Sequence, residues 1–177
     1  MRCKEKRQKN AIESAFLKDN TGIYNLSFKT EKTVKIKIEV DTSPPLQFQT
    51  ENHTLMLPFS FVTRCFDLPS LYAGKMHALL FRNWKDRVKG RDWYDFEWYV
   101  RHRIRLDLIH FQQRMTQSHP EIPVPETLPE LKTLIKERIG KLNVEDAKFD
   151  VAPFIKDTST LDIWSRGYFC DVADQMV

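Results

Sequence analysis

The sequence contains few cysteines and few glycines. Its three cysteines, Cys3, Cys65 and Cys170, are far apart and form no CxxC pair. A disulfide scaffold is therefore not expected, and the pattern favours a reducing compartment. With only five glycines, the chain also has no Gly-rich loop of the kind that cradles phosphate.

Long hydrophobic runs are absent as well. No apolar stretch approaches the ~20 residues of a membrane-spanning helix, and the charged residues 1–7 are not followed by the apolar segment of a secretory signal. The sequence therefore predicts a cytoplasmic protein with no membrane partner. Hydrophobic residues still make up 41% of the 177 residues, which is enough for a buried core. The net charge is only +4, so clusters of basic residues are more informative than the total.

The order of predicted elements indicates an α+β fold. A helix over 3–19 precedes a group of strands, which the patterns place at 24–29, 34–41, 46–50, 54–57 and 60–66. Helical periodicity then runs over 69–82, 92–115, 127–140 and 144–150, with a helical tail around Trp164. We therefore expect a small antiparallel or mixed sheet in a first domain, 1–67, and a helical second domain, 68–177.

Residues 35–41 alternate between polar and apolar side chains, as in a half-buried strand. Glu39 and Asp41 fall on the polar face, ~7 Å apart, which is close enough to share a metal–phosphate site. A polar face that is simply exposed to solvent explains the same pattern.

The predicted helix over 71–82 places two cations in line. At ~100° per residue, Lys75 and Arg82 lie on one side of the helix with the small Ala78 between them. This leaves room for a polyanion such as a triphosphate, which lysine neutralises as a point charge. Two unrelated surface cations are the alternative.

Residues 89–95, Lys-Gly-Arg-Asp-Trp-Tyr-Asp, form a basic loop followed by the start of a helix. Asp92 and Asp95 lie in the first turn, where carboxylates interact favourably with the helix dipole. Asp95 is also one turn from Arg91, within reach of an ion pair. Helix stability therefore explains these residues as well as a binding site does.

Taken together, these segments resemble the AbiEii/AbiGii toxin family of nucleotidyltransferases. The similarity rests on the strand 37–40, on the A-x-K-x-x-A pattern within 71–79, and above all on 89–95, which looks like the family's K-x-R-D-x-x-D signature. The segment 150–155, followed by Trp164, is similar to the family's closing segment. The resemblance covers nearly the whole chain, in order.

The resemblance implies a partial nucleotidyltransferase-like fold and NTP-dependent nucleotidyl transfer supported by Mg²⁺. It also implies tRNA as the acceptor and a cognate antitoxin as the partner. The implied catalytic residues are Glu39, Lys75 and Asp95, and Glu39 with Asp41 would hold the metal. The residues implied in nucleotide binding lie in the two helical segments: Lys75, Arg82, Lys89, Arg91 and Asp92.

The chain departs from the family pattern in one respect. Family members open with a Gly-Ser motif followed, about a dozen residues later, by two carboxylates on a strand, and nothing before Lys35 matches it. We therefore expect a truncated, inactive form, in which the helix over 3–19 follows the missing strand. A non-catalytic module that binds nucleotide, RNA or antitoxin is the alternative, and a structural helical domain with coincidental matches is a third.

Overall fold

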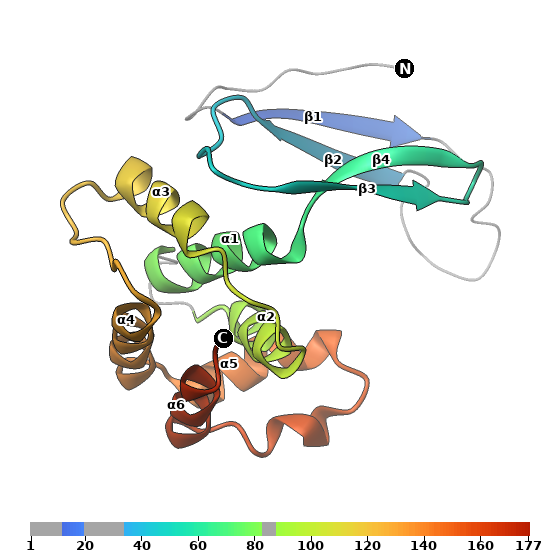
Figure 1. Ribbon diagram of the computed structural model, residues 1–177. Helices are drawn as coiled ribbons and strands as arrows, with labels where there is room; N and C mark the ends of the chain where they lie inside the picture. The colour runs from blue at the N-terminus through green and yellow to red at the C-terminus, as the bar shows by residue number, and fades with distance from the viewer. Residues whose placement is uncertain (1–11, 20–33, 83–87) are drawn as a thin grey trace. The chain divides into compact units, whose positions relative to one another are not determined.

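The computed structural model describes residues 12–19, 34–82 and 88–177. The chain divides into two units, Met1–Pro44 and Pro45–Val177, and each is described by itself. The first unit contains a pair of strands, and the second contains another pair of strands together with the helices (Figure 1). This composition confirms the predicted α+β class.

The strands of the first unit are β1 (Ile12–Asp19) and β2 (Val34–Asp41), which pair antiparallel over their full length. The strand predicted over 34–41 is confirmed. Its alternating β-branched residues suit a pleated surface, and they continue the ladder without a bulge.

The helix predicted over 3–19 is wrong for residues 12–19, which form β1. A short segment with a mixed apolar pattern is compatible with either structure, and here a β-branched strand is available to satisfy its backbone groups. Residues 12–19 therefore do not form the helix that was expected to follow a missing strand. The strand predicted over 24–29 lies outside the described residues.

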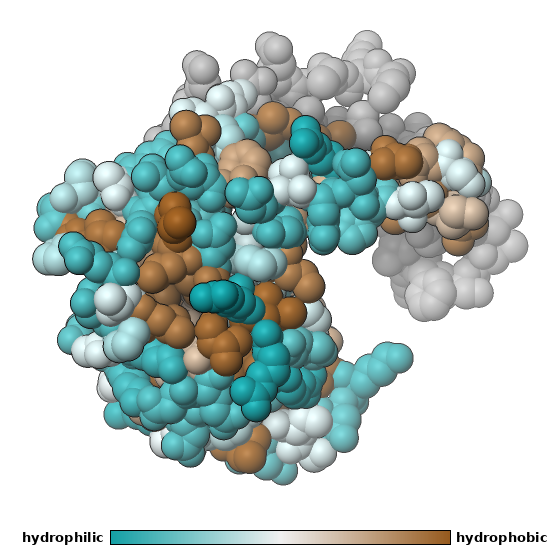
Figure 2. Space-filling view, in the orientation of Figure 1, coloured by the Kyte–Doolittle hydropathy of each residue, from teal (hydrophilic) through white to brown (hydrophobic). Residues whose placement is uncertain are grey.

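The second unit begins with a hairpin of β3 (Thr50–Leu55) and β4 (Phe61–Phe66), paired antiparallel. The strand predicted over 60–66 is confirmed within one residue. Hydrophobic side chains remain at the surface around the turn of this hairpin (Figure 2), among them Met56, Leu57 and Phe59.

The segment before β3, predicted as a strand over 46–50, instead bonds to helices. The buried His110 ring donates from Nδ1 to the carbonyl of Leu46, at 2.9 Å. The backbone N–H of Gln49 donates to Ser70 Oγ, at 2.9 Å. These bonds satisfy backbone polar groups that would otherwise bond to a neighbouring strand. They also attach the base of the hairpin to the helical region.

The first three helices are α1 (Leu68–Phe81), α2 (Gly90–Arg101) and α3 (Leu108–Ser118). The single helix predicted over 92–115 is therefore wrong, because the chain turns between α2 and α3. Arg103 has a φ of 56°, in the left-handed region, and its N–H bonds to Val100 in a tightened last turn. Asp107 then caps α3 by accepting from the N–H of His110.

The prolines between 118 and 128 separate α3 from α4 (Leu128–Gly140), as the sequence predicted. After α5 (Val144–Val151) come two single turns, η1 (Ala152–Phe154) and η2 (Thr158–Leu161), and then α6 (Arg166–Asp174). The helices predicted over 127–140 and 144–150 are thus confirmed within a residue or two.

Each helix that the structure describes contributes buried side chains to one core. Contacts run from α1 to α2 and α3, from α2 to α5 and α6, and from α4 to α6 (Figure 1). Fully buried members include Tyr72, Phe96, Phe111, Leu131 and Phe169. Burial of such a side chain contributes roughly 1.5–3 kcal/mol, against up to ~1 kcal/mol for an exposed ion pair. Apolar packing therefore holds the helices in place and fixes what they carry on their surface.

Among the described residues, no helix is long and apolar enough to cross a membrane.

Candidate functional site

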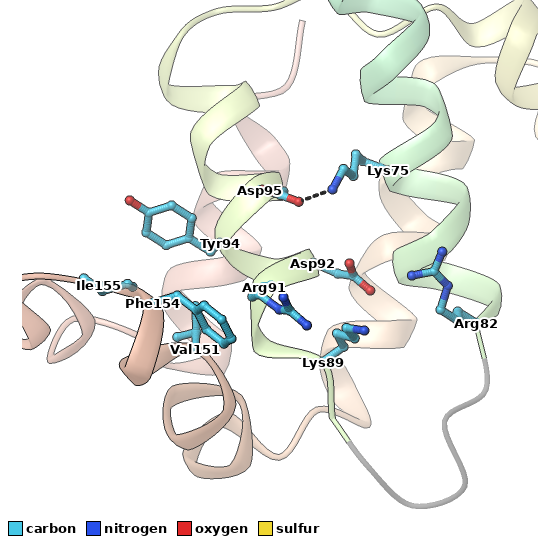
Figure 3. Close-up of a pocket in the computed structure, with 10 residues that line it drawn as sticks. All are labelled: Lys75, Arg82, Lys89, Arg91, Asp92, Tyr94, Asp95, Val151, Phe154 and Ile155. Atoms are coloured by element: carbon cyan, nitrogen blue, oxygen red, sulfur yellow. Dashed lines mark hydrogen bonds and ion pairs between the residues drawn. The ribbon is translucent and has the colours of Figure 1, made fainter. Parts of the chain in front are cut away.

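A pocket of about 460 Å³ lies where α1, the start of α2 and the end of α5 meet (Figure 3). This volume falls within the ~300–1,000 Å³ of small-molecule sites. Every candidate residue that the sequence predicted in this unit lines the pocket. Its lining residues are Lys75, Arg82, Lys89, Arg91, Asp92, Tyr94, Asp95, Val151, Phe154 and Ile155.

Helix α1 supplies Lys75, and Arg82 is its C-cap residue. The two are seven residues apart and so lie close to the same side of the helix. The adjacent side of the helix is buried in the core through Tyr72, Met76 and Leu79. Because packing fixes the rotation of α1, both cations must face the pocket.

Lys75 forms an ion pair across the pocket with Asp95 of α2 (Figure 3). The distance from Lys75 Nζ to Asp95 Oδ2 is 2.6 Å, and both side chains are partly exposed. An exposed pair of this kind adds up to ~1 kcal/mol of stability. Its larger effect is positional, because the carboxylate restrains a long, flexible ammonium side chain. The sequence also left open an Asp95–Arg91 pair, but the Arg91 guanidinium lies over the Phe154 ring, 4.5 Å from its centroid.

Asp92 is the buried carboxyl group of the pocket, with 7% of the residue exposed. Its side chain points between those of Arg82 and Lys89 (Figure 3). Burial raises the pKa of Asp92 above its ordinary value, while the positive charges of Arg82, Lys75 and Lys89 act in the opposite direction. Asp92 therefore lies among the basic residues and partly offsets their charge.

Gly90 allows the start of α2 to approach α5 closely. A Cβ at this position would lie 1.9 Å from the carbonyl oxygen of Ala147. The Gly90 N–H donates to Asp150 Oδ2, at 3.0 Å, and Lys89 offers no side-chain cap of its own. Asp150, from α5, thus caps α2, which joins the basic loop to the next wall of the pocket.

The apolar wall of the pocket consists of Val151, Phe154 and Ile155, at the end of α5 and in the turn after it. The sequence did not predict these residues as part of the site, although the segment 150–155 contributed to the family resemblance. Tyr94 was missed too. Phe154 is exposed and follows a helix, and nothing in the neighbouring sequence indicates which distant cations it will face.

In total, four cationic and two carboxylate side chains line the pocket, which is a formal excess of two positive charges. Together with the apolar wall, this composition suits a ligand that has both an anionic and a planar or apolar part.

Comparison with protein families identifies the chain. The family model described as "Nucleotidyl transferase AbiEii toxin, Type IV TA system" matches residues 3–166. The chain belongs to the AbiEii family. No curated protein and no solved structure gave a significant match.

As an AbiEii nucleotidyltransferase of a type IV toxin–antitoxin system, the protein belongs to a class of enzymes that use an NTP and a divalent metal. The carboxylates predicted to hold metal, Glu39 and Asp41, lie on β2 in the other unit. Whether they share a site with Lys75 and Asp95 stays a prediction.

Glu39 and Asp41 have the ligand chemistry that Mg²⁺ requires. Both are exposed carboxylates two residues apart on one strand, and Mg²⁺ is commonly bound by one or two carboxylates together with substrate phosphates. Glu39 forms an ion pair with Lys37, and Asp41 accepts a bond from the Ser43 N–H. Metal binding through the same oxygen of Glu39 would therefore compete with the Lys37 ammonium. The described residues contain no cluster of three or more potential metal ligands.

Proposed function

We propose that the pocket between α1, α2 and α5 binds the triphosphate of an NTP, as part of nucleotidyl transfer by this AbiEii family member. The observation that carries the proposal is the Lys75–Asp95 pair at the edge of a pocket that also contains Arg82 and Lys89. We assign to Asp95 the role of holding the Lys75 ammonium toward the phosphates. Asp92, buried beside Arg82 and Lys89, would limit how strongly the empty pocket attracts other anions.

The magnitudes fit such a role. Two opposite unit charges ~4 Å apart attract by about 1 kcal/mol in bulk water and about 4 kcal/mol near a protein surface. A triphosphate that meets three cations can therefore gain several kcal/mol, part of which is spent in removing water. Since these charges are partly exposed, NTP affinity should fall as salt rises.

The proposed reaction is transfer of a nucleotide to tRNA. An acceptor hydroxyl loses its proton to water and its oxygen bonds to the α-phosphorus, the bond from that phosphorus to the bridging oxygen breaks, and pyrophosphate leaves. Lys75 and Arg82 would stabilise the negative charge that develops on the pyrophosphate. Glu39 and Asp41 would hold Mg²⁺, which when bound assists in activating the hydroxyl and in stabilising the leaving group. We further propose that a cognate antitoxin is the partner and that the protein acts in the cytoplasm.

Equilibrium binding of a labelled NTP in the absence of acceptor RNA tests the phosphate site. Lys75→Ala should weaken binding about tenfold or more, since hydrogen bonds to charged groups are worth ~1.5–3 kcal/mol. Lys136→Ala is the matched control, because Lys136 forms an ion pair with Asp174 of the same 2.6 Å length, away from the pocket. Equal affinities for the two variants would exclude the proposed role of Lys75.

A further inference from the structure

The pocket has two walls of different chemistry. Lys75 and Arg82 of α1 and Lys89 before α2 form a cationic wall, while Phe154 and Ile155 form an apolar wall beyond Arg91 (Figure 3). The cationic wall suits the phosphates of a nucleotide, as proposed above. The apolar wall has no part in that role.

Phe154 is largely exposed, although another residue of the same wall is buried. The residue is 64% exposed, whereas Val151, three residues earlier in the same wall, is 1% exposed and belongs to the core. One face of the phenyl ring is covered by the Arg91 guanidinium, 4.5 Å from the ring centroid. The two groups form a cation–π contact, and guanidinium and phenyl groups are both surfaces on which nucleobases stack.

The backbone holds this ring in place before any ligand arrives. Phe154 ends the turn η1, which contains Pro153 and is closed by a bond from the Ile155 N–H to the Ala152 carbonyl, at 3.2 Å. Asp150, just before the turn, bonds to Gly90 at the start of α2. The turn that carries the ring is thus joined to the basic loop, and a rigid backbone loses little conformational entropy on binding.

We infer that Phe154, with Arg91, is the platform on which the nucleobase of the NTP stacks. The inference rests on the proposed triphosphate site, because the phosphates place the base within reach of this wall. Stacking on a phenyl ring is tolerant of base identity, since every base has a π-face. Phe154 therefore distinguishes a nucleotide from a bare polyphosphate, and it contributes little to the choice among the four bases.

The test compares two ligands, an NTP and inorganic tripolyphosphate, on the full chain. Phe154→Ala should weaken NTP binding about tenfold, within the range that alanine substitution gives at stacking sites, and leave tripolyphosphate binding within about twofold. Phe154→Trp should keep NTP affinity, and Phe154→Leu, which retains apolar area without a ring, should lose most of it. Phe149→Ala is the matched control, because Phe149 is 85% exposed on α5 and does not line the pocket.

The possible outcomes separate the two proposals. If Phe154→Ala loses equal affinity for NTP and for tripolyphosphate, the ring only supports the fold. If it loses affinity for neither ligand, the base lies elsewhere. Either result would overturn the proposal that Phe154 is a platform for the base. If the unsubstituted chain binds neither ligand, the triphosphate site itself is wrong. If Phe154→Leu binds NTP as well as Phe154→Trp does, apolar contact without stacking explains the wall.

Discussion

Replacement of Gly90 by alanine should destabilise the helical unit and disturb the pocket at the same time. The added Cβ would lie 1.9 Å from the Ala147 carbonyl oxygen and 2.9 Å from its carbon, whereas real Cβ contacts are essentially never below 3.0 Å. Both of these atoms are backbone, so no side chain can rotate to relieve the contact. The start of α2 and α5 must separate by about 1 Å, and this would stretch the 3.0 Å bond from Gly90 to Asp150.

The expected loss of stability follows from two opposing terms. Overpacking of a well-packed site costs about 1–3 kcal/mol, occasionally more, and a weakened helix cap costs about 1 kcal/mol. Alanine regains up to about 1 kcal/mol over glycine within a helix. A net loss of about 2 kcal/mol remains. For a chain of this size each kcal/mol shifts Tm by roughly 2–4 °C, so Tm should fall by about 4–8 °C.

Thermal unfolding followed by circular dichroism measures this shift. Gly140→Ala is the matched control, since nothing lies within 4 Å of a Cβ at the end of α4, and its Tm should stay the same or rise. NTP affinity should fall in Gly90→Ala and not in Gly140→Ala, because Lys89 and Arg91 flank only the former position. A Gly90→Ala protein that melts as high as Gly140→Ala would refute the reasoning.

Two further predictions concern pH and activity. Burial lowers the pKa of His77 to about 4, and the nearby charges of Arg114, His119, Arg82 and His110 act in the same direction. The ring is therefore neutral in the folded protein, and the free energy of unfolding should fall as pH drops from about 6.5, the ordinary pKa of histidine, toward 4. Urea titrations should show a smaller fall for His77→Gln. The proposed reaction predicts that the chain, incubated with labelled NTP, Mg²⁺ and tRNA, yields labelled tRNA, and that this label disappears on Lys75→Ala. Binding of NTP without formation of labelled tRNA would instead support the non-catalytic module.

The sequence predicted the cationic face of α1 because a helix repeats at a fixed angle. Lys75 and Arg82 are seven residues apart, and the adjacent apolar residues show which side is buried. A single helix thus carries its own information about which residues share a face. The sequence also placed Asp95 in the first turn of a helix. Its contact with Lys75, however, depends on how α1 and α2 cross.

Features that depend on distant partners could not be predicted in this way. Residues 12–19 form a strand because β2 pairs with them, and nothing within the segment reveals that partner. The chain leaves α2 at Arg103, where a positive φ in a residue other than glycine gives no sequence signal. Phe154 likewise belongs to the site only because α5 packs against the start of α2.

The packing of α5 against α2 explains why both walls of the pocket depend on one contact. Gly90 lets the two helices approach, and Asp150 bonds to the N–H that this approach brings within reach. On one side of this contact lie Lys89 and Arg91, and a few residues beyond Asp150 lies Phe154. A substitution that separates the helices should therefore weaken phosphate and base contacts together, whereas Lys75→Ala and Phe154→Ala should each remove one of them.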